Sequence, residues 1–239
     1  MIRKVVVEDY AALSNLAAGI AAGMIWSKPE LVLGLPTGGT PVGFYKALVN
    51  MGISLAKVRT FNLDEYVGLP REHPESYYSF MKRNLYDYVD LDPANAHLPN
   101  GNAPDPEEEC RRYEEAIRAA GGIDLMILGI GHNGHIGFNE PGTPWDSRTR
   151  RVSLTETTRK ANARFFSSLD AVPREALTMG IGTIMESRRI MLLASGKDKA
   201  AIIDRALNGD PTTSVPATVL QQHPDVIVIV DRAAAGLDG

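Results

Sequence analysis

A histidine, a glutamate and an asparagine that could cooperate in proton transfer lie within eight residues of one glycine-rich segment, as Asn133, His135 and Glu140. An imidazole can give and take a proton near neutral pH, and a nearby polar partner can fix which ring nitrogen carries that proton. A structural histidine beside a solvated glutamate is the alternative interpretation. The segment thus predicts an acid–base site centred on His135.

The same segment begins two other patterns that it does not complete. Residues 129–134 read G-x-G-x-x-G, but the glycines and proline that follow cannot form the helix of a dinucleotide site, and residues 148–151 are rich in arginine where that site needs an acid. His132, His135 and Glu140 could chelate a metal, but a glycine separates the histidines and no further ligand cluster is at hand. We therefore expect neither a nicotinamide cofactor nor a metal.

Two adjacent carboxylates, Asp64 and Glu65, follow a short apolar run. If that run is a buried strand, one carboxylate can be desolvated and its pKa raised, which suits a general base. A helix cap or an ion pair with an arginine is the alternative role for either residue. The pattern predicts Asp64 as a candidate base and leaves this alternative open.

A second apolar run leads into a short loop that ends at Pro41, where a helix can begin. The glycines of such a loop let backbone N–H groups approach an anion, and the helix N-terminus adds partial positive charge. A simple turn between strand and helix is the alternative. We expect a phosphate-binding loop made of Thr37, Gly38, Gly39 and Thr40.

Basic residues gather in the second half of the chain. Arginine is suited to bidentate phosphate contacts, although most such residues are solvated surface charges. We expect one arginine and one lysine of this group to reach a bound anion. The group consists of Arg148, Arg150, Arg151, Arg159, Lys160 and Arg164, followed later by Lys197 and Lys199.

Short apolar runs alternate with helical patterns along the whole chain, which predicts a single α/β domain over residues 1–239 with a parallel sheet covered on both faces by helices. The chemistry is then expected beyond the carboxyl ends of the strands, where two irregular segments, 69–74 and 138–151, also lie. The predicted strands cover residues 4–7, 31–35, 58–61, 125–130, 189–193 and 226–230, and the main predicted helices cover 9–26, 41–49, 105–119 and 197–207.

Composition excludes several classes of protein. The 239 residues are 44% apolar and 23% charged, which is typical of a globular chain, and the net charge of −4 argues against binding nucleic acid through bulk positive charge. No apolar run is long enough to span a bilayer. The single cysteine, Cys110, cannot form an internal disulfide. We expect a soluble, cytoplasmic protein.

Several segments together resemble the glucosamine-6-phosphate deaminase family. The resemblance implies a Rossmann-like three-layer sandwich with a mostly parallel sheet. It also implies an enzyme that converts glucosamine 6-phosphate and water to fructose 6-phosphate and ammonia without a redox cofactor or a metal. The matching segments are LGLPTGGTP (33–41), FNLDEYVGLPREHPESYYSFM (61–81), GHIGFNEPG (134–142), SRTR (147–150), ANARFF (161–166) and VPREALTMGIGTIM (172–185).

The resemblance also implies roles for single residues. Asp64 matches the base that removes the C2 proton, His135 the residue that accepts a proton during ring opening, and Glu140 its carboxylate partner. Asn133 stands where hexameric members have aspartate. An amide can hold the imidazole but cannot share its positive charge, so ring opening is expected to depend more on Glu140. The phosphate-binding positions are Thr37, Gly38, Gly39, Thr40, Arg164 and Lys199.

Other departures concern regulation. Residues 141–146 differ from the allosteric segment of hexameric members, Val152 replaces a lysine there, and the tail is shorter. We expect an unregulated monomer or small homo-oligomer rather than an allosteric hexamer, with the segment 155–169 moving over the ligand. The alternatives are a 6-phosphogluconolactonase, which needs no C2 base, and a sugar-phosphate-binding sensor, which would carry a DNA-binding segment or lack the acid–base residues.

Overall fold

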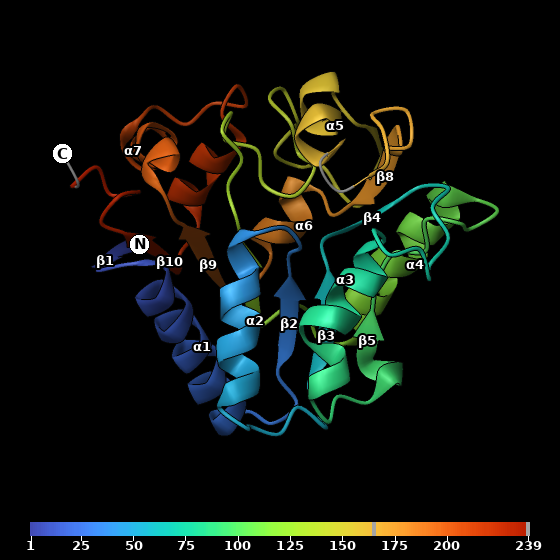
Figure 1. Cartoon of the computed structure of the whole chain (residues 1–239), viewed down its shortest axis with the longest axis horizontal. Helices are drawn as coiled ribbons and strands as arrows, with labels where there is room; N and C mark the ends of the chain where they lie inside the picture. Colours follow the sequence, from blue (N-terminus) through green and yellow to red (C-terminus); the bar gives the residue numbers. More distant parts are fainter. Residues whose placement is uncertain (164–165, 238–239) are drawn as a thin grey trace.

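The computed structural model describes residues 1–163 and 166–237, with the side chain of residue 161 left out. Seven parallel strands form the central sheet (Figure 1). In spatial order they are β1 (Ile2–Val7), β10 (Val226–Asp231), β9 (Arg189–Ala194), β6 (Leu125–Leu128), β2 (Val32–Leu35), β3 (Arg59–Asn62) and β5 (Ala96–His97). The predicted mostly parallel α/β sheet is confirmed.

Both faces of this sheet are buried. Leu125 and Ile127 of β6 pack with α1 (Tyr10–Ser27), α2 (Thr40–Asn50) and α3 (Tyr77–Asn84), whereas Met126 and Leu128 pack into the opposite core. That second core is covered by α4 (Pro106–Ala119), α6 (Ile181–Met185) and α7 (Ala200–Asn208), together with the 3₁₀ segment η5 (Pro216–Gln222). Because strand side chains alternate between faces, a strand buried on both sides is apolar throughout, which is why these strands could be read from the sequence.

The predicted elements are present with small shifts in their ends. The strand expected over 125–130 ends at Leu128, because glycines turn the chain immediately afterwards. The last predicted helix splits into the 3₁₀ turn η4 (Lys197–Lys199) and α7. Within the central sheet and the helices that cover it, β5, which is two residues long, α3 and α6 were not predicted. Two further 3₁₀ turns are η1 (Tyr86–Tyr88) and η2 (Pro93–Asn95).

A small antiparallel sheet, which the sequence did not predict, lies beside the main one. Its order is β4 (Asp64–Tyr66), β8 (Glu175–Thr178) and β7 (Arg150–Ser153), and α5 (Glu156–Asn162) follows β7 along the chain. Strand β4 begins only two residues after β3 ends. The pairing of β4 with β8 therefore orients Asp64 and Glu65 relative to the central sheet.

The order of the strands decides which loops meet. Strands β9, β6, β2 and β3 are neighbours in the sheet and run parallel, so their carboxyl ends lie along one edge. The loops after these four strands carry the lysine, histidine, threonine–glycine and aspartate segments singled out in the sequence. The fold thus brings together residues up to 162 positions apart, from Thr37 to Lys199.

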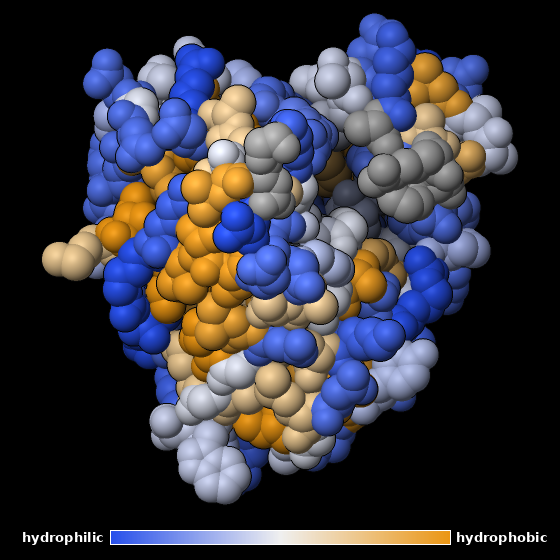
Figure 2. All heavy atoms as spheres, turned by 60° about the vertical axis from the view of Figure 1, so that its left-hand side comes forward, coloured by the Kyte–Doolittle hydropathy of each residue, from blue (hydrophilic) through white to orange (hydrophobic). Residues whose placement is uncertain are grey.

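The surface also carries an apolar area. Figure 2 shows an apolar band down the face of the molecule that brings the left-hand side of Figure 1 forward. The large apolar side chains exposed along β1 and α1 include Val6 and Trp26. Among the described residues, no helix is long and apolar enough to cross a membrane.

Candidate active site

A cavity of about 410 Å³ opens at the carboxyl edge of the central sheet. This volume lies within the range of about 300–1,000 Å³ that is usual for small-molecule sites. Its polar lining comes from the segments that follow β2, β3, β6 and β9 and from α3 and α5. The polar side chains that line it are Thr37, Thr40, Asp64, Tyr77, His132, His135, Thr158, Asn162, Asp198 and Lys199.

The loop after β2 forms one wall of the cavity. Thr37, Gly38, Gly39 and Thr40 all line it, and α2 begins at Thr40 with Pro41 as its next residue. Gly38 has φ +100°, a backbone conformation that residues other than glycine rarely adopt. The N-terminal end of α2 therefore faces the cavity with its partial positive charge, which favours an anion.

The adjacent carboxylates of Asp64 and Glu65 have different surroundings. Asp64 is 6% exposed and lines the cavity. The Glu65 carboxylate accepts hydrogen bonds from the backbone N–H groups of Tyr66, Tyr77 and Tyr78, at 2.8, 3.0 and 2.9 Å. Tyr77 and Tyr78 form the first turn of α3, so Glu65 caps that helix. Glu65 thus takes the helix-cap role that the sequence left open, and Asp64 remains the candidate base.

Burial perturbs the Asp64 carboxyl group strongly. Loss of solvation, and after it the negative charge of Glu65, raises the pKa of Asp64 to about 8. A carboxylate that is this costly to ionise binds a proton tightly, which is the property required of a carboxylate base acting on a carbon acid.

His135 is connected to Glu140 through Asn133. The Nδ2 of Asn133 donates to Glu140 Oε2 at 2.7 Å, and its Oδ1 lies 2.7 Å from His135 Nδ1. A carboxylate only accepts hydrogen bonds, so the amide must turn its NH₂ toward Glu140 and its oxygen toward the imidazole. His135 Nδ1 therefore carries a hydrogen, and in the neutral ring Nε2 keeps a lone pair.

Two effects on the pKa of His135 oppose each other. Burial, the larger effect, lowers it, and the negative charge of Glu140 raises it, with His135 Nδ1 and Glu140 Oε2 3.8 Å apart. The positive charges of Lys199 and His132 add to the lowering. The net result is a pKa below the usual value of 6.5. The neutral imidazole is therefore the prevailing form at pH 7.

Two glycines allow this part of the site to be compact. A Cβ on Gly131 would lie 2.1 Å from the His135 ring, so the imidazole packs against bare backbone. A Cβ on Gly137 would lie 3.6 Å from Asp64 Oδ2. The Gly137 backbone therefore lies beside Asp64, and Gly137 is only two residues from His135 along the chain. Asp64 and His135 line the same cavity.

Helix α5 contributes to the other side of Glu140. The hydroxyl groups of Thr158 and Thr155 both donate to Glu140 Oε1. Neither threonine was singled out in the sequence, where a Thr-x-x-Thr spacing at a helix start is the only available signal. Both carboxylate oxygens of Glu140 are thus held, one by α5 and one by Asn133.

Of the predicted basic group, Lys199 and not the arginines 148–151 reaches this cavity. Its Nζ donates to the Ile130 carbonyl at 3.1 Å, and burial lowers its pKa. Arg148 and Arg151 instead form ion pairs with Glu186 and Glu175, and together with Arg150 they line a separate cavity between α4 and β7. Arg164 lies outside the described residues.

The irregular segments divide in the same way. Segment 138–151 contributes Phe138 and Glu140 to the site, whereas residues 69–74 do not line the cavity. The sequence also missed Tyr77, whose ring stacks on Phe138 with centroids 6.1 Å apart. Its signal was the capping residue Ser76, which accepts a hydrogen bond from the N–H of Ser79 at the start of α3.

Within residues 1–163 and 166–237, no three His, Cys, Asp or Glu side chains are grouped so that they could hold a metal ion. The pair His132–Asp198, with Nε2 and Oδ2 2.5 Å apart, bridges the loops after β6 and β9 at the cavity rim. The chemistry that these residues offer is acid–base chemistry on a small anionic ligand.

Comparisons with known proteins identify the family of the chain. The family model described as glucosamine-6-phosphate isomerases/6-phosphogluconolactonase matches residues 8–228. A glucosamine-6-phosphate deaminase of Thermoanaerobacter pseudethanolicus is 53% identical over 98% of this chain and 94% of its own length. One of Shouchella clausii is 51% identical over 97% of this chain and 95% of its own.

Solved structures give the same result. A monomeric glucosamine-6-phosphate deaminase superposes with a TM-score of 0.95 and 48% identity over 99% of both chains. A 6-phosphogluconolactonase from Trypanosoma cruzi has a TM-score of 0.80 at 20% identity, covering 99% of this chain and 96% of its own, and shares the fold. With the family model covering most of its length and relatives at about half identity, the chain belongs to the glucosamine-6-phosphate isomerase/6-phosphogluconolactonase family.

Proposed function

We propose that this chain is an enzyme that converts glucosamine 6-phosphate and water into fructose 6-phosphate and ammonia. The relatives at 49–53% identity that carry the name glucosamine-6-phosphate deaminase support this substrate and reaction. The observation that carries the proposal is the position of Asp64. Its buried carboxylate, with a raised pKa, shares one cavity with His135 and with the loop between β2 and α2, as removal of a C2 proton requires.

His135 opens the pyranose ring in this mechanism. Its Nε2 accepts the proton of the C1 hydroxyl and delivers a proton to the ring oxygen, and the C1 aldehyde forms as the C1–O5 bond breaks. The lone pair on Nε2 follows from the hydrogen bond that Nδ1 gives to Asn133. While the His135 imidazole carries the extra proton, Glu140 stabilises its positive charge through the Asn133 amide.

Asp64 then acts on the open chain. The new aldehyde makes the C2 proton acidic, and the Asp64 carboxylate removes it to give an enolamine. Return of the proton to C1 gives a ketimine at C2, and water replaces its nitrogen to yield the ketone and ammonia. No step requires an oxidant or a reductant.

The anion-binding wall holds the phosphate at the other end of the sugar. We assign this role to the backbone N–H groups of the loop Thr37, Gly38, Gly39 and Thr40, and to Lys199. The N-terminus of α2 and the lysine both attract a dianion, and both line the cavity. Arg164 remains a predicted phosphate contact from the family resemblance.

The test is ammonia release from glucosamine 6-phosphate by the purified chain and two variants. Asp64→Asn and His135→Gln should each lower kcat by about 10²–10⁴-fold, the usual contribution of an acid–base residue. Asp124→Asn is the control for the loss of a buried aspartate, and His223→Gln for the loss of a buried histidine, since neither residue lines the cavity. Full turnover by Asp64→Asn, or turnover of 6-phosphogluconolactone in place of the amino sugar, would contradict the proposal.

We also propose that the enzyme is a cytoplasmic monomer without allosteric activation. The structural match with 48% identity is described as monomeric, and the edge strand β1 carries the exposed charges Arg3 and Lys4, which disfavour pairing with a second sheet. Light scattering should give the mass of one chain. Substrate saturation should be hyperbolic and unchanged by N-acetylglucosamine 6-phosphate, and a sigmoidal curve abolished by that compound would contradict this assignment.

A further inference from the structure

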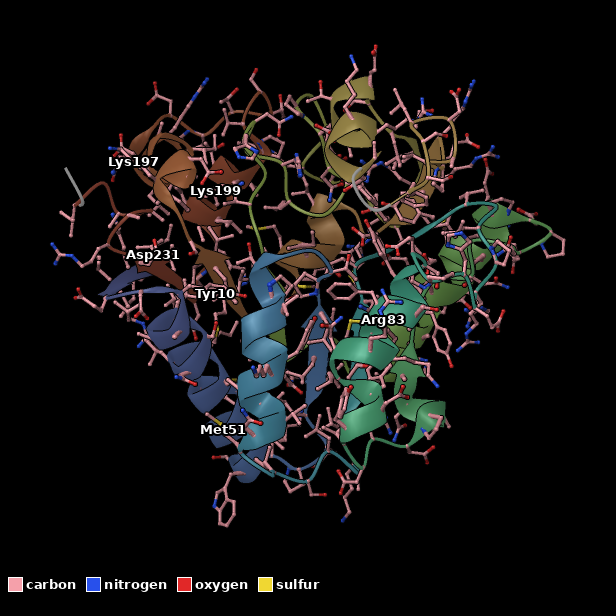
Figure 3. All side chains as sticks on the ribbon, in the orientation of Figure 1. Tyr10, Met51, Arg83, Lys197, Lys199 and Asp231 are labelled. Atoms are coloured by element: carbon pink, nitrogen blue, oxygen red, sulfur yellow. The ribbon has the colours of Figure 1, made fainter. Side chains whose placement is uncertain are left out.

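One tyrosine outside the cavity contacts the phosphate-binding loop from behind. Tyr10 is the first residue of α1 and is not part of the cavity lining. Its hydroxyl donates to the Thr40 carbonyl at 2.8 Å, with the Gly39 carbonyl at 3.2 Å, and accepts from the N–H of Gly43 at 2.8 Å. Figure 3 shows Tyr10 at the upper end of α1, the end that lies toward Lys199.

These contacts place the hydroxyl inside the first turn of α2. In an α-helix the N–H of Gly43 would bond to the carbonyl four residues earlier, which is that of Gly39. The Tyr10 hydroxyl lies between these two groups and relays the bond. A side chain inserted in this way bends a helix locally, so the direction in which the first turn leaves the loop depends on the hydroxyl.

The residue at position 43 fits this arrangement. A glycine in a helix interior lowers helix stability relative to alanine. Here a Cβ would lie 2.2 Å from Ser14 Oγ and 2.8 Å from the Tyr10 hydroxyl. Gly43 therefore gives up helix propensity in exchange for close contact between α1 and α2 at the point where Tyr10 reaches the backbone.

We propose that Tyr10 is a positioning residue that holds the Thr37, Gly38, Gly39 and Thr40 loop in its phosphate-binding conformation before substrate arrives. The inference rests on the phosphate role proposed for that loop. Without the hydroxyl, the first turn of α2 loses a bridging group between its N–H and carbonyl groups, and the loop must be ordered when the ligand binds. The cost of that ordering appears as weaker binding.

A purely structural tyrosine would affect folding and leave ligand affinity unchanged, so the experiment measures both. Tyr10→Phe keeps the ring and removes the hydroxyl. We expect it to raise KM for glucosamine 6-phosphate and the inhibition constant of inorganic phosphate by the same factor, roughly three- to tenfold, with kcat within about twofold. This range corresponds to the loss of one or two neutral hydrogen bonds.

Ser14→Ala is the matched control. Ser14 packs at the same α1–α2 contact, but its hydroxyl donates to the Tyr10 backbone carbonyl and touches no residue of the loop. We expect it to lower the unfolding midpoint by as much as Tyr10→Phe while KM and phosphate inhibition stay at the wild-type values. Gly43→Ala, which displaces the Tyr10 hydroxyl, should reproduce the affinity loss of Tyr10→Phe even if its helix propensity stabilises the fold.

The outcomes distinguish the role of Tyr10 from the role of the loop. If phosphate inhibits the wild type competitively but inhibits Tyr10→Phe with the same constant, the positioning role is wrong and the phosphate site stands. A fall in kcat with KM unchanged would also overturn the role. If phosphate does not compete in the wild type, the assignment of the loop itself fails, and the role of Tyr10 with it.

Discussion

Replacing Asp64 by asparagine should stabilise the folded protein while lowering kcat by about 10²–10⁴-fold. Asp64 is buried, and its pKa rises from 3.8 to about 8 on folding. Asparagine has almost the same shape and no charge, so it removes the cost of burying the ionised carboxylate. The effect should depend on pH, because the cost exists only where the unfolded chain carries the charge.

The sign and size follow from the two pKa values. Below pH 3.8 the carboxyl group is protonated in both states, and the two proteins should be about equally stable. Between pH 3.8 and about 8 the unfolded chain loses the proton and the folded protein keeps it, so the free energy of unfolding of the wild type falls as pH rises. About four pH units at about 1.4 kcal/mol each set an upper limit of about 6 kcal/mol. Because the cavity admits water beside the carboxylate, we expect an advantage of about 2–4 kcal/mol for the variant at pH 9.

Urea denaturation of both proteins from pH 4 to pH 9, followed by tryptophan fluorescence, measures this difference. Asp124→Asn is the control, since its pKa is shifted in the opposite direction. Burial alone would raise the pKa of Asp124, but the hydrogen bonds from Lys28, from the Val32 N–H and from Arg188 outweigh burial and lower it. That variant should be less stable than the wild type above pH 4. An advantage of Asp64→Asn that did not grow between pH 5 and pH 8 would contradict the raised pKa of Asp64.

Three further changes test the remaining parts of the site. Glu140→Gln should lower the pKa of His135 further, because the charge of Glu140 raises it, and an NMR titration of the imidazole measures this shift. Lys199→Met should raise KM about 10–100-fold, which corresponds to the loss of one charge-assisted hydrogen bond to phosphate, with little change in kcat. Steady-state kinetics at saturating substrate measure both constants, and a large loss of kcat would contradict this role. Glu65→Gln should cost about 1–3 kcal/mol of stability, because three backbone N–H groups lose a charged acceptor. The same variant should move the acid limb of the kcat/KM profile to lower pH, because the charge of Glu65 raises the pKa of Asp64.

The central sheet could be predicted from the sequence because its strands are buried on both faces. Strand β10 (Val226–Asp231) is fully buried and almost wholly apolar, so pattern alone identifies it. Strand β7 (Arg150–Ser153) is half exposed and begins with two arginines, and β5 is two residues long. Neither strand carries a pattern of its own, because each forms through pairing with a neighbour already in place.

The roles within the site were predicted in part. The sequence located the Asp64–Glu65 pair but could not assign their roles, because the choice depends on where α3 begins, eleven residues after Tyr66. One arginine of the basic group was expected to reach the ligand, and the sequence could not show that Arg148 and Arg151 instead pair with Glu186 and Glu175, which come from distant elements. Ion pairs of this kind depend on tertiary contacts that a local pattern does not contain.

The perturbed pKa values point to a way in which the substrate itself prepares the enzyme. Burial raises the pKa of Asp64 and lowers that of His135, so the empty site at neutral pH favours two uncharged groups. The amide of Asn133 fits this state, since it holds the imidazole without adding a second negative charge. An amino sugar brings an ammonium group attached to C2, the carbon on which Asp64 acts in the proposed mechanism. Its positive charge lowers the pKa of the aspartate on binding and favours the ionised base. A lactone has no such charge, so in the proposed mechanism the interaction that activates the base also favours the amino sugar.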